Sequence, residues 1–360
     1  MSRNLAPLTV TAALFATTAW ADVPQVATDI SPVHSLVAQV MEGVGEPALI
    51  IAPGASPHEY SLRPSEAGAL QEADLVFWIG PDLTPWMTDA IDTLASNAVV
   101  TTLMDADGTT VLPFRESALF EAHAHGDEDH DHGKDHDEHG HDDHADHDDH
   151  GHEDHADHDD HGHEEPADHD DHAHEEHADH EDHGHDDHAH GAHDPHIWLS
   201  PDNGAVWLNA IAAQLSAIDP DNAGTYYANA AAARDDLAAT RTEIETILDP
   251  VRDRNFIVFH DAYQYFETAF NFPASGAISV SDATDPSPAR IAEIQDRVKD
   301  QGVTCVLSEP QFDPGIVEAV MEGSEARTGV LDPLGSDLEP GTDVYGQVLR
   351  NLAKTLADCL

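Results

Sequence analysis

The sequence predicts an α/β protein of two lobes, each built on a parallel sheet, joined by a long helix. Short apolar runs alternate with helical stretches in both halves of the chain, as in parallel sheets covered by helices. An alanine-rich stretch over residues 222–248 separates the halves, and as a single helix it would be about 40 Å long. This length suits a bridge between two (β/α)4-like lobes better than a part of one small lobe.

In the first half, two apolar runs are expected to form strands. Residues 49–52 and 75–79 each end at a pair of Gly and Pro, which interrupt regular structure. Between them a helical pattern begins at Pro64 and continues through Leu70, because proline is well tolerated in the first turn of a helix.

The middle of the chain is expected to be helical. A helix should start at residues 200–203 and run to Ile218, where residues 219–221 (DPD) break it. The long helix at 222–248 follows, and Asp249-Pro250 closes it.

The second half repeats the alternation of strands and helices. The expected strands cover residues 256–259, 277–280, 303–307 and 329–331. The expected helices cover residues 288–299, 315–321 and 345–356. A four-stranded lobe in which helices follow several strands is the simplest assignment.

Length and composition divide the chain into segments. Without an N-terminal signal and a His-rich insert, 268 residues remain, which is too many for one small core and enough for two lobes. The expected segments are a signal peptide at 1–21, an N-terminal lobe at 22–200 with the insert at 121–194, a helical segment at 201–249 and a C-terminal lobe at 250–360.

The N-terminus has the features of an export signal. Arg3 supplies positive charge, residues 5–18 are mostly apolar, and residues 19–21 (AWA) form a small-x-small cleavage site. A retained membrane anchor is the alternative, but a stretch this short that contains Pro7 does not span a bilayer. We expect an exported protein whose mature chain begins at Asp22.

The only two cysteines, Cys305 and Cys359, are expected to form a disulfide, because an exported chain meets an oxidising compartment. A thiolate metal pair is the alternative. It would need two more soft ligands for a closed site, and the other candidates in this chain are hard or borderline ligands.

The charge of the chain excludes nucleic acid as a partner. The formal net charge is −57. Outside the insert the chain has 42 acidic residues and only 13 basic ones. Phosphate backbones select Lys and Arg, which are scarce here. An acidic surface favours cations nearby, although a charge excess is more often a means of solubility.

The insert holds 25 of the 29 histidines, between His123 and His193, interleaved with 29 acidic residues and Lys134. Its few apolar side chains cannot offset the entropy of ordering the chain, so we expect a solvated, disordered segment. Imidazole and carboxylate at this density bind metals at many weak sites. An expanded repeat without a functional role is the alternative.

Four histidines lie outside the insert: His34, His58, His196 and His260. Ligands of open parallel sheets gather at the carboxyl ends of strands. His58 lies just beyond an expected strand, and His260 and Asp332 directly follow strands. His196 stands at the start of a short apolar run, so its place is less secure. His34 lies at an expected helix start, where capping or a surface position is the favoured interpretation and metal ligation the minor one.

Two histidines and an aspartate at three strand ends predict a metal site. A single histidine is more often a packed or capping residue, but three residues at the same kind of position are hard to explain by packing. Their wide spacing excludes a local motif, so the ligands must converge from both lobes in a cleft. Three imidazoles with one carboxylate suit zinc, whereas manganese sites use more oxygen ligands.

Five ordered motifs resemble the zinc-uptake branch of the periplasmic metal receptors of ABC transporters, the ZnuA type. They are GASPHEYSLRPSEA at 54–67, HIWLSPDNG at 196–204, FHDAYQYF at 259–266, SEPQF at 308–312 and LDPLG at 331–335. The resemblance covers essentially the whole mature chain. It implies two α/β lobes joined by a rigid long helix, with the metal site in the cleft between the lobes.

The resemblance also implies roles for single residues. Histidines at the places of His58, His196 and His260 bind zinc in that family, and an acidic residue or a water completes the shell. The place of Asp332 is a ligand position in manganese-binding relatives, which carry Glu where this chain has His260. The fourth ligand is therefore expected to be Asp332, Glu59 or water.

Other residues near the expected site are assigned supporting roles. Glu309 in SEPQF is interpreted as a hydrogen-bonding or cleft-wall residue and not as a ligand. Asp261 and Tyr263 are expected to orient His260, because metal-bound imidazoles donate their second N–H to a neighbouring acceptor. The insert lies where zinc-specific members of the family carry a comparable loop, and the two cysteines match a disulfide found in part of the family.

The function implied is that of a periplasmic receptor, which captures Zn²⁺ with high affinity and delivers it to the membrane permease of an ABC importer. We expect a monomer without catalytic activity, whose insert gathers additional zinc weakly. A receptor for manganese or another divalent metal is the first alternative. A secreted zinc hydrolase and a metal store or adhesin without a transporter are the others, although no local motif supplies a convincing general base for hydrolysis.

Overall fold

The computed structural model describes residues 23–115, 193–279 and 286–360. All of them belong to a single compact unit. The signal peptide expected at 1–21 and most of the insert expected at 121–194 lie outside the described residues.

The first sheet has four parallel strands in the order β2-β1-β3-β4. The strands are β1 (Val26–Thr28), β2 (Ala48–Leu49), β3 (Leu75–Trp78) and β4 (Val99–Thr102). The intervening helices are α1 (Ser31–Val40), α2 (Pro64–Glu72) and α3 (Pro85–Leu94), and the short turn η1 (Leu103–Asp105) follows β4. Three of the helical segments begin with proline at or next to the first position, where its missing N–H is not needed.

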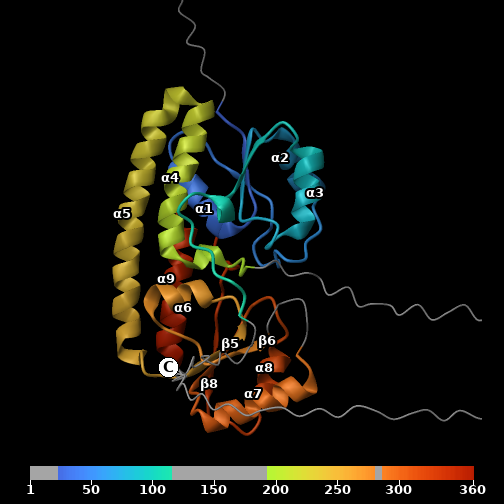
Figure 1. The fold of residues 1–360 in the computed structure, drawn as a ribbon, viewed down its shortest axis with the longest axis vertical. Helices are drawn as coiled ribbons and strands as arrows, with labels where there is room; N and C mark the ends of the chain where they lie inside the picture. The colour runs from blue at the N-terminus through green and yellow to red at the C-terminus, as the bar shows by residue number, and fades with distance from the viewer. Residues whose placement is uncertain (1–22, 116–192, 280–285) are drawn as a thin grey trace, which may run out of the picture. The chain divides into compact units, whose positions relative to one another are not determined.

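The second sheet repeats this plan, with four parallel strands in the order β6-β5-β7-β8. The strands are β5 (Phe256–His260), β6 (Ala277–Ser279), β7 (Cys305–Ser308) and β8 (Arg327–Val330). The helices are α6 (Gln264–Phe270), α7 (Pro288–Asp300), α8 (Pro314–Met321) and α9 (Val344–Cys359) (Figure 1). We call the parts built on the first and second sheets the N-terminal and C-terminal lobes.

Helices cover both faces of each sheet, because strand side chains alternate between two apolar cores. In β3, Leu75 and Phe77 belong to the main core, and Val76 belongs to a smaller core with residues of α2 and α3. In β5, Val258 belongs to the main core, and Phe259 belongs to a smaller core with residues of α7 and α8. The main core includes strands and helices of both lobes, so the lobes share one apolar interior.

Two long helices connect the sheets. The turn η2 (Ile197–Leu199) leads into α4 (Pro201–Ile218), and the turn η3 (Pro220–Asn222) leads into α5 (Ala223–Leu248), which η4 (Asp249–Val251) closes. Helices α4 and α5 run side by side (Figure 1), and α5 also packs against α1 and α9. With 26 residues, α5 is about 39 Å long. A helix of the expected length thus spans helices from both lobes.

The fold class predicted from the sequence is confirmed by the two parallel sheets. The apolar pattern does not predict β1, β4, α1, α3 or α6 as full elements. Strand β1 has only three residues, and the side chains of β4 are partly or well exposed, so neither makes a continuous apolar run. The domain boundaries at 22–200, 201–249 and 250–360 stay a prediction.

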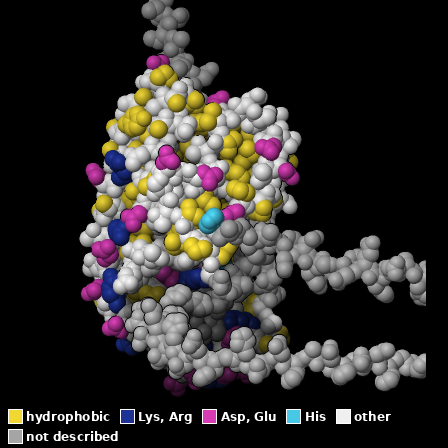
Figure 2. All heavy atoms as spheres, viewed as in Figure 1, with side chains coloured by type: hydrophobic (Ala, Val, Ile, Leu, Met, Phe, Trp, Pro, Cys, Tyr) yellow, Lys and Arg dark blue, Asp and Glu magenta, His cyan; other side chains and the backbone are white. Residues whose placement is uncertain are grey.

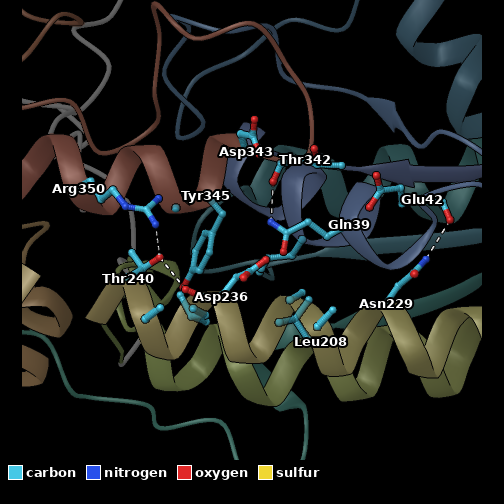
Figure 3. A pocket seen from close by; sticks show the side chains of 16 residues that line it. Gln39, Glu42, Leu208, Asn229, Asp236, Thr240, Thr342, Asp343, Tyr345 and Arg350 are labelled. Carbon is cyan, nitrogen blue, oxygen red and sulfur yellow. Dashed lines mark hydrogen bonds between the residues drawn. The ribbon is translucent and has the colours of Figure 1, made fainter. Parts of the chain in front are cut away.

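The start of α9 is fastened to α1 and α5 around a cavity of about 370 Å³ (Figure 3). Gln39 of α1 donates from Nε2 to the carbonyl oxygen of Thr342 at 2.6 Å. Arg350 of α9 donates from Nη2 to Thr240 Oγ1 of α5 at 2.7 Å. These bonds join the helix that ends the chain to the first and the longest helices of the structure.

Tyr345 at the start of α9 also holds the turn η2. Its hydroxyl lies 2.9 Å and 3.0 Å from the carbonyl oxygens of Trp198 and Ser200. The indole Nε1 of Trp198 donates to Pro333 O at 2.8 Å. Gly204 of α4 permits this contact, because a Cβ there would overlap the Tyr345 ring. The turn beside His196 is therefore bonded to the C-terminal lobe.

Cys305 and Cys359 form the expected disulfide, with Cα atoms 5.8 Å apart. The bond joins the start of β7 to the end of α9. The alternative interpretation of these cysteines as a thiolate metal pair is thereby excluded.

Surface charge is predominantly negative in the described part of the chain as well. On the face drawn in Figure 2, acidic side chains are scattered among fewer Lys and Arg and do not gather into one patch. None of the helices among the described residues combines the length and apolar character needed to cross a membrane.

Candidate metal centre

Three histidines line one small cavity. His58, His196 and His260 border a space of about 20 Å³. The remaining lining residues are Ser56, Pro57, Trp198, Glu309, Gln311, Phe312, Pro333 and Leu334. Such a volume holds about one water molecule or one ion. The structure therefore brings together three of the four predicted ligands, one from the N-terminal lobe, one from the turn before α4 and one from the C-terminal lobe.

His260 ends strand β5 and is backed by Glu309, which directly follows the neighbouring strand β7. Because β5 and β7 are parallel, their carboxyl ends meet at one edge of the sheet. Glu309 Oε1 accepts from His260 Nδ1 at 2.7 Å and from His260 N at 3.3 Å. Both residues are buried. The hydrogen-bonding role expected for Glu309 is thus present.

His196 is backed in the same way by Asp194. Asp194 Oδ1 accepts from the backbone N of His196 at 3.0 Å and from its Nδ1 at 2.7 Å. The hydroxyl of Tyr265 donates to Asp194 O at 2.8 Å and fixes the segment to α6. Burial raises the pKa of Asp194 to about 7, although the hydrogen bond from His196 N and the charge of Arg115 lower it.

His58 lies in the loop between β2 and α2. Its backbone N donates to Ser56 Oγ at 3.3 Å, and Trp86 Nε1 of α3 donates to Pro57 O at 2.8 Å. The indole thus anchors the loop next to the histidine. The His58 ring is half-buried, and its centroid lies 5.5 Å from that of His196.

The spacing of His196 and His260 matches that of two ligands on one ion. Their Nε2 atoms are 3.3 Å apart and their ring centroids 5.1 Å apart. Two imidazole nitrogens on one tetrahedral zinc, each about 2.0 Å from the metal, would be about 3.3 Å apart, and their ring centres about 5 Å apart. The two rings are therefore already placed to share a cation.

Hydrogen-bond chemistry supports the same conclusion. Each of the two rings directs Nδ1 at a carboxylate oxygen, which makes Nδ1 the protonated nitrogen and leaves a lone pair on Nε2 of a neutral ring. Two such lone pairs at 3.3 Å repel each other, so a proton or a cation belongs between them. Within the described residues, no three His, Cys, Asp or Glu groups are already arranged to hold an ion, so the pair is the preformed part of the site.

The fourth predicted ligand, Asp332, does not border this cavity and lines a different one beside α9. Its Oδ1 accepts from the backbone N of Leu334 and of Gly335, both at 3.0 Å, and its Oδ2 accepts from Ser336 N at 2.6 Å. The carboxylate therefore stabilises its own turn. Glu59, the other acidic candidate, is exposed and does not border the cavity of the histidines.

The prediction that Asp261 and Tyr263 orient His260 is wrong about the acceptor of its ring N–H, which is Glu309. The Nδ1 atom of His260 contacts Glu309, and Asp261 instead pairs with Arg115 at 2.9 Å. The Tyr263 hydroxyl donates to Leu331 O at 3.4 Å, and its ring lies edge-on to that of His260 with centroids 6.3 Å apart. Burial, reinforced by nearby carboxylates, raises the pKa of Tyr263 well above its usual value.

A buried charge cluster lies behind the two carboxylate-backed histidines. Arg115 forms two hydrogen bonds of 3.0 Å with the carboxylate of Glu267, in addition to its ion pair with Asp261. Burial raises the pKa of Asp261 to about 7, and the charge of Arg115 opposes this rise. The cluster holds Arg115 and the chain around Asp194 against α6 of the C-terminal lobe.

His34 takes no part in the site. It is buried in α1, and its Nε2 lies 3.1 Å from Pro47 O. The prediction of a capping or surface position is wrong, because the helix begins three residues earlier at Ser31 and turns the imidazole toward the loop before β2. Burial lowers the pKa of this imidazole.

Asp194 is the site residue that pattern analysis misses. The composition of the insert assigns it to the acidic run at 121–194, although the structure uses it as the partner of His196. The one local signal is its spacing, two residues before a candidate ligand, which lets one carboxylate bind both the backbone and the ring of that residue.

Two parallel-sheet lobes connected by a long helix, with imidazoles from both lobes at one cavity, define a two-lobed metal-binding receptor. The profile of the ZnuA family, described as "Zinc-uptake complex component A periplasmic", matches residues 26–359. The chain belongs to this family.

Relatives with this name match along most of their length. The "High-affinity zinc uptake system protein ZnuA" of Brucella abortus (strain 2308) is 48% identical over 335 residues, which cover 93% of this chain and 91% of that protein. The protein of the same name from Paracoccus denitrificans (strain Pd 1222) is 44% identical over 341 residues, covering 94% and 93%. A solved structure titled "Crystal structure of ZnuA" has the same fold, with a TM-score of 0.65 and 21% identity over 93% of this chain and 98% of that one.

Proposed function

We propose that this chain captures Zn²⁺ in the cavity between its lobes, with His58, His196 and His260 as the protein ligands. The observation that carries the proposal is the 3.3 Å separation of the Nε2 atoms of His196 and His260, each backed by a buried carboxylate. A small movement of the His58 ring toward this pair would complete a shell of three nitrogens. Carboxylate-backed imidazoles are the usual arrangement at zinc sites, because the second hydrogen bond fixes the tautomer.

The donor set favours zinc over manganese. Three nitrogen donors suit a borderline cation in tetrahedral geometry, whereas manganese sites contain more oxygen donors. In this chain the acidic residues beside the rings bind the rings themselves, and Asp332 is engaged by its own turn. The zinc named in the titles of the relatives agrees with this choice.

We further propose that the loaded receptor works in the periplasm as a monomer and delivers zinc to the membrane permease of an ABC importer. The description of the family as periplasmic and the zinc-uptake names of the relatives support this role. The insert at 121–194 would gather zinc weakly at many sites and raise its concentration next to the cavity, as tethering does in general.

A receptor is favoured over a zinc hydrolase by the placement of the acidic residues. A hydrolase needs a general base within reach of the metal-bound water. Glu309 borders the cavity, but its Oε1 accepts two hydrogen bonds from His260. Assays with ester and peptide substrates after zinc loading should therefore show no turnover, and turnover that His260→Ala abolishes would reverse the assignment.

Calorimetric titration with Zn²⁺ tests the proposed site. The full chain should bind one ion tightly and several weakly. His58→Ala, His196→Ala and His260→Ala should each remove the tight site and keep the weak ones. His193→Ala is the matched control, because that ring is half exposed and does not border the cavity. A tight site that survives all three substitutions would refute the ligand set.

Two further experiments test the wider role. Deletion of residues 123–193 should remove the weak sites alone, and loss of the tight site on deletion would overturn the division between cavity and insert. Cells that lack the gene should grow poorly in chelated medium and recover with added zinc. Normal growth under chelation would favour a metal store or adhesin over a transport receptor.

A further inference from the structure

Gln311 lines the cavity of the histidines and contributes a buried, unpaired carbonyl oxygen. It lies in the loop after β7, two residues beyond Glu309. Its Nε2 atom donates to Ser336 Oγ at 3.2 Å, but its Oε1 atom has no hydrogen-bond partner among the described residues. Buried acceptors nearly always have a partner, because an unpaired one loses its hydration without compensation.

The orientation of this amide is set by a polar chain that starts at Asp332. The Asp332 carboxylate accepts from three backbone N–H groups of its turn, and Ser336 Oγ donates to its Oδ1 at 3.3 Å. With its hydrogen directed at Asp332, Ser336 Oγ can only accept from Gln311. The part of the amide that faces Ser336 is therefore the NH₂ group, and the carbonyl oxygen is the end that has no partner among the described residues.

The size of the cavity restricts what this oxygen can meet. A space of about 20 Å³ holds roughly one water molecule. An ion held between the Nε2 atoms of His196 and His260 would therefore leave room for one water on it, and Gln311 is one of the residues that line this space. A tetrahedral ion with three imidazole ligands has one position left for a water. Asp332 and Glu59 do not border the cavity, whereas Gln311 does.

We propose that Gln311 positions the water that completes the zinc shell, by accepting a hydrogen bond from it at Oε1. This inference rests on the proposed function. A neutral acceptor holds the water without adding an anionic oxygen ligand, which keeps the donor set rich in nitrogen and favours zinc over metals that prefer oxygen. Asp332 then serves the site through Ser336 and Gln311, without touching the metal.

Cobalt(II) is a suitable probe, because its visible absorption reports the ligands and the protonation of bound water. The full chain is loaded with less than one equivalent of Co²⁺, so that only the tight site is filled, and its spectrum is followed against pH. The spectrum of the His260→Ala variant under the same conditions shows what weak sites alone would give. In Gln311→Leu the bound water loses its acceptor, so its pKa should fall below the wild-type value. In Gln311→Glu the added negative charge disfavours hydroxide, so the pKa should rise.

Zinc affinity is the second measurement. Gln311→Leu should weaken the tight site about tenfold, as the loss of a partner outside the metal ligands generally does. Ser336→Ala keeps the amide but frees its rotation, so it should show a smaller effect in the same direction, and it replaces Gln311→Leu if that variant does not fold. Gln347→Leu, on an exposed position of α9, is the matched control and should change neither measurement.

Three outcomes oppose the inference or its basis. Equal zinc affinities and equal water pKa values in wild type, Gln311→Leu and Gln311→Glu would overturn the inference and leave the tight site standing. A Gln311→Leu spectrum that differs in shape from wild type at every pH would make Gln311 a direct ligand, which also overturns it. A wild-type chain without a tight site would overturn the proposed function itself.

Discussion

The Nε2 atoms of His196 and His260 lie 3.3 Å apart, although the two residues are 64 positions apart in the chain. Each ring has a carboxylate behind it, Asp194 for the first and Glu309 for the second. The carboxylates fix both tautomers so that the lone pairs face each other. This arrangement suits a shared cation and makes the two acids the natural first targets for mutation.

Glu309→Gln should lower zinc affinity about tenfold to a hundredfold, because it removes the negative charge that makes His260 a better donor while keeping an acceptor for Nδ1. Asp194→Asn should act in the same way on His196. Competition with a chelator of known affinity measures both effects.

The matched controls for these two substitutions are Glu322→Gln and Asp253→Asn, at exposed positions away from the cavity. Unchanged affinity in both test variants would show that the acids only pack against the rings.

We expect His34 to make the metal-free protein less stable as the pH falls. Burial lowers its folded pKa below the ordinary value of 6.5, with the hydrogen bond to Pro47 O and the charge of Glu46 opposing the shift. Well above pH 6.5 the imidazole is neutral in both the folded and the unfolded protein. As the pH falls through 6.5, the unfolded chain takes up the proton first, because its pKa is the higher one. The contribution of this residue to the stability of the folded protein is therefore lost in acid. His34→Gln keeps a donor for Pro47 O without titrating.

Urea unfolding at several pH values measures this effect. The metal-free wild type should lose more stability than His34→Gln between pH 7 and more acidic conditions, and the difference between the two proteins should stay constant above pH 7. A constant difference across the whole range would contradict the assignment.

The Cys305–Cys359 disulfide should stabilise the protein without tuning the metal site. It closes a ring over a sequence separation of 54 residues, which in the chain-entropy picture contributes about 4 kcal/mol. Glu309 lies four residues farther along, about 13 Å up the strand direction from Cys305. The double variant Cys305→Ser with Cys359→Ser should unfold at lower urea concentration and keep its zinc affinity once folded. A large loss of affinity in the folded variant would show that the bond sets the position of β7 at the site.

Gly204→Ala should destabilise the protein, because the added methyl group overlaps the ring and hydroxyl of Tyr345. The overlap would push the hydroxyl away from the carbonyl oxygens of Trp198 and Ser200. Tyr345→Phe removes the hydroxyl, so the double variant should lose less stability than the sum of the two single variants. Thermal or urea unfolding of the four proteins completes the cycle, and strictly additive losses would argue against a direct overlap.

Much of the secondary structure follows from local pattern. Prolines and glycines mark the ends of the runs that become β2 and β3, and prolines mark the starts of α2 and α4, because these residues change the backbone only locally. Short or half-exposed strands such as β1 and β4 could not be predicted in this way, because they lack the continuous apolar run that identifies a buried strand.

Part of the site could be predicted from the residues that lie at the ends of expected strands. His260 ends β5 and His58 lies in the loop after β2, and ligands of parallel sheets gather at such strand ends. Asp332 lies just after β8 but does not border the cavity, so position at a strand end was not sufficient by itself. His196 was harder to place, because it precedes a 3₁₀ turn and its position depends on Asp194 and on Tyr345 from the end of the chain.

The sequence by itself determined which segments form helices and strands and which histidines are candidate ligands, because apolar periodicity and residue chemistry are local properties. Only the tertiary structure decided the partners: Glu309 and not Asp261 behind His260, and Asp332 engaged with its own turn. The physical reason is that buried donors and acceptors compete for one another across the whole fold. Which partner each group finds depends on which strands are neighbours and on how the turns are formed. No local sequence pattern encodes this.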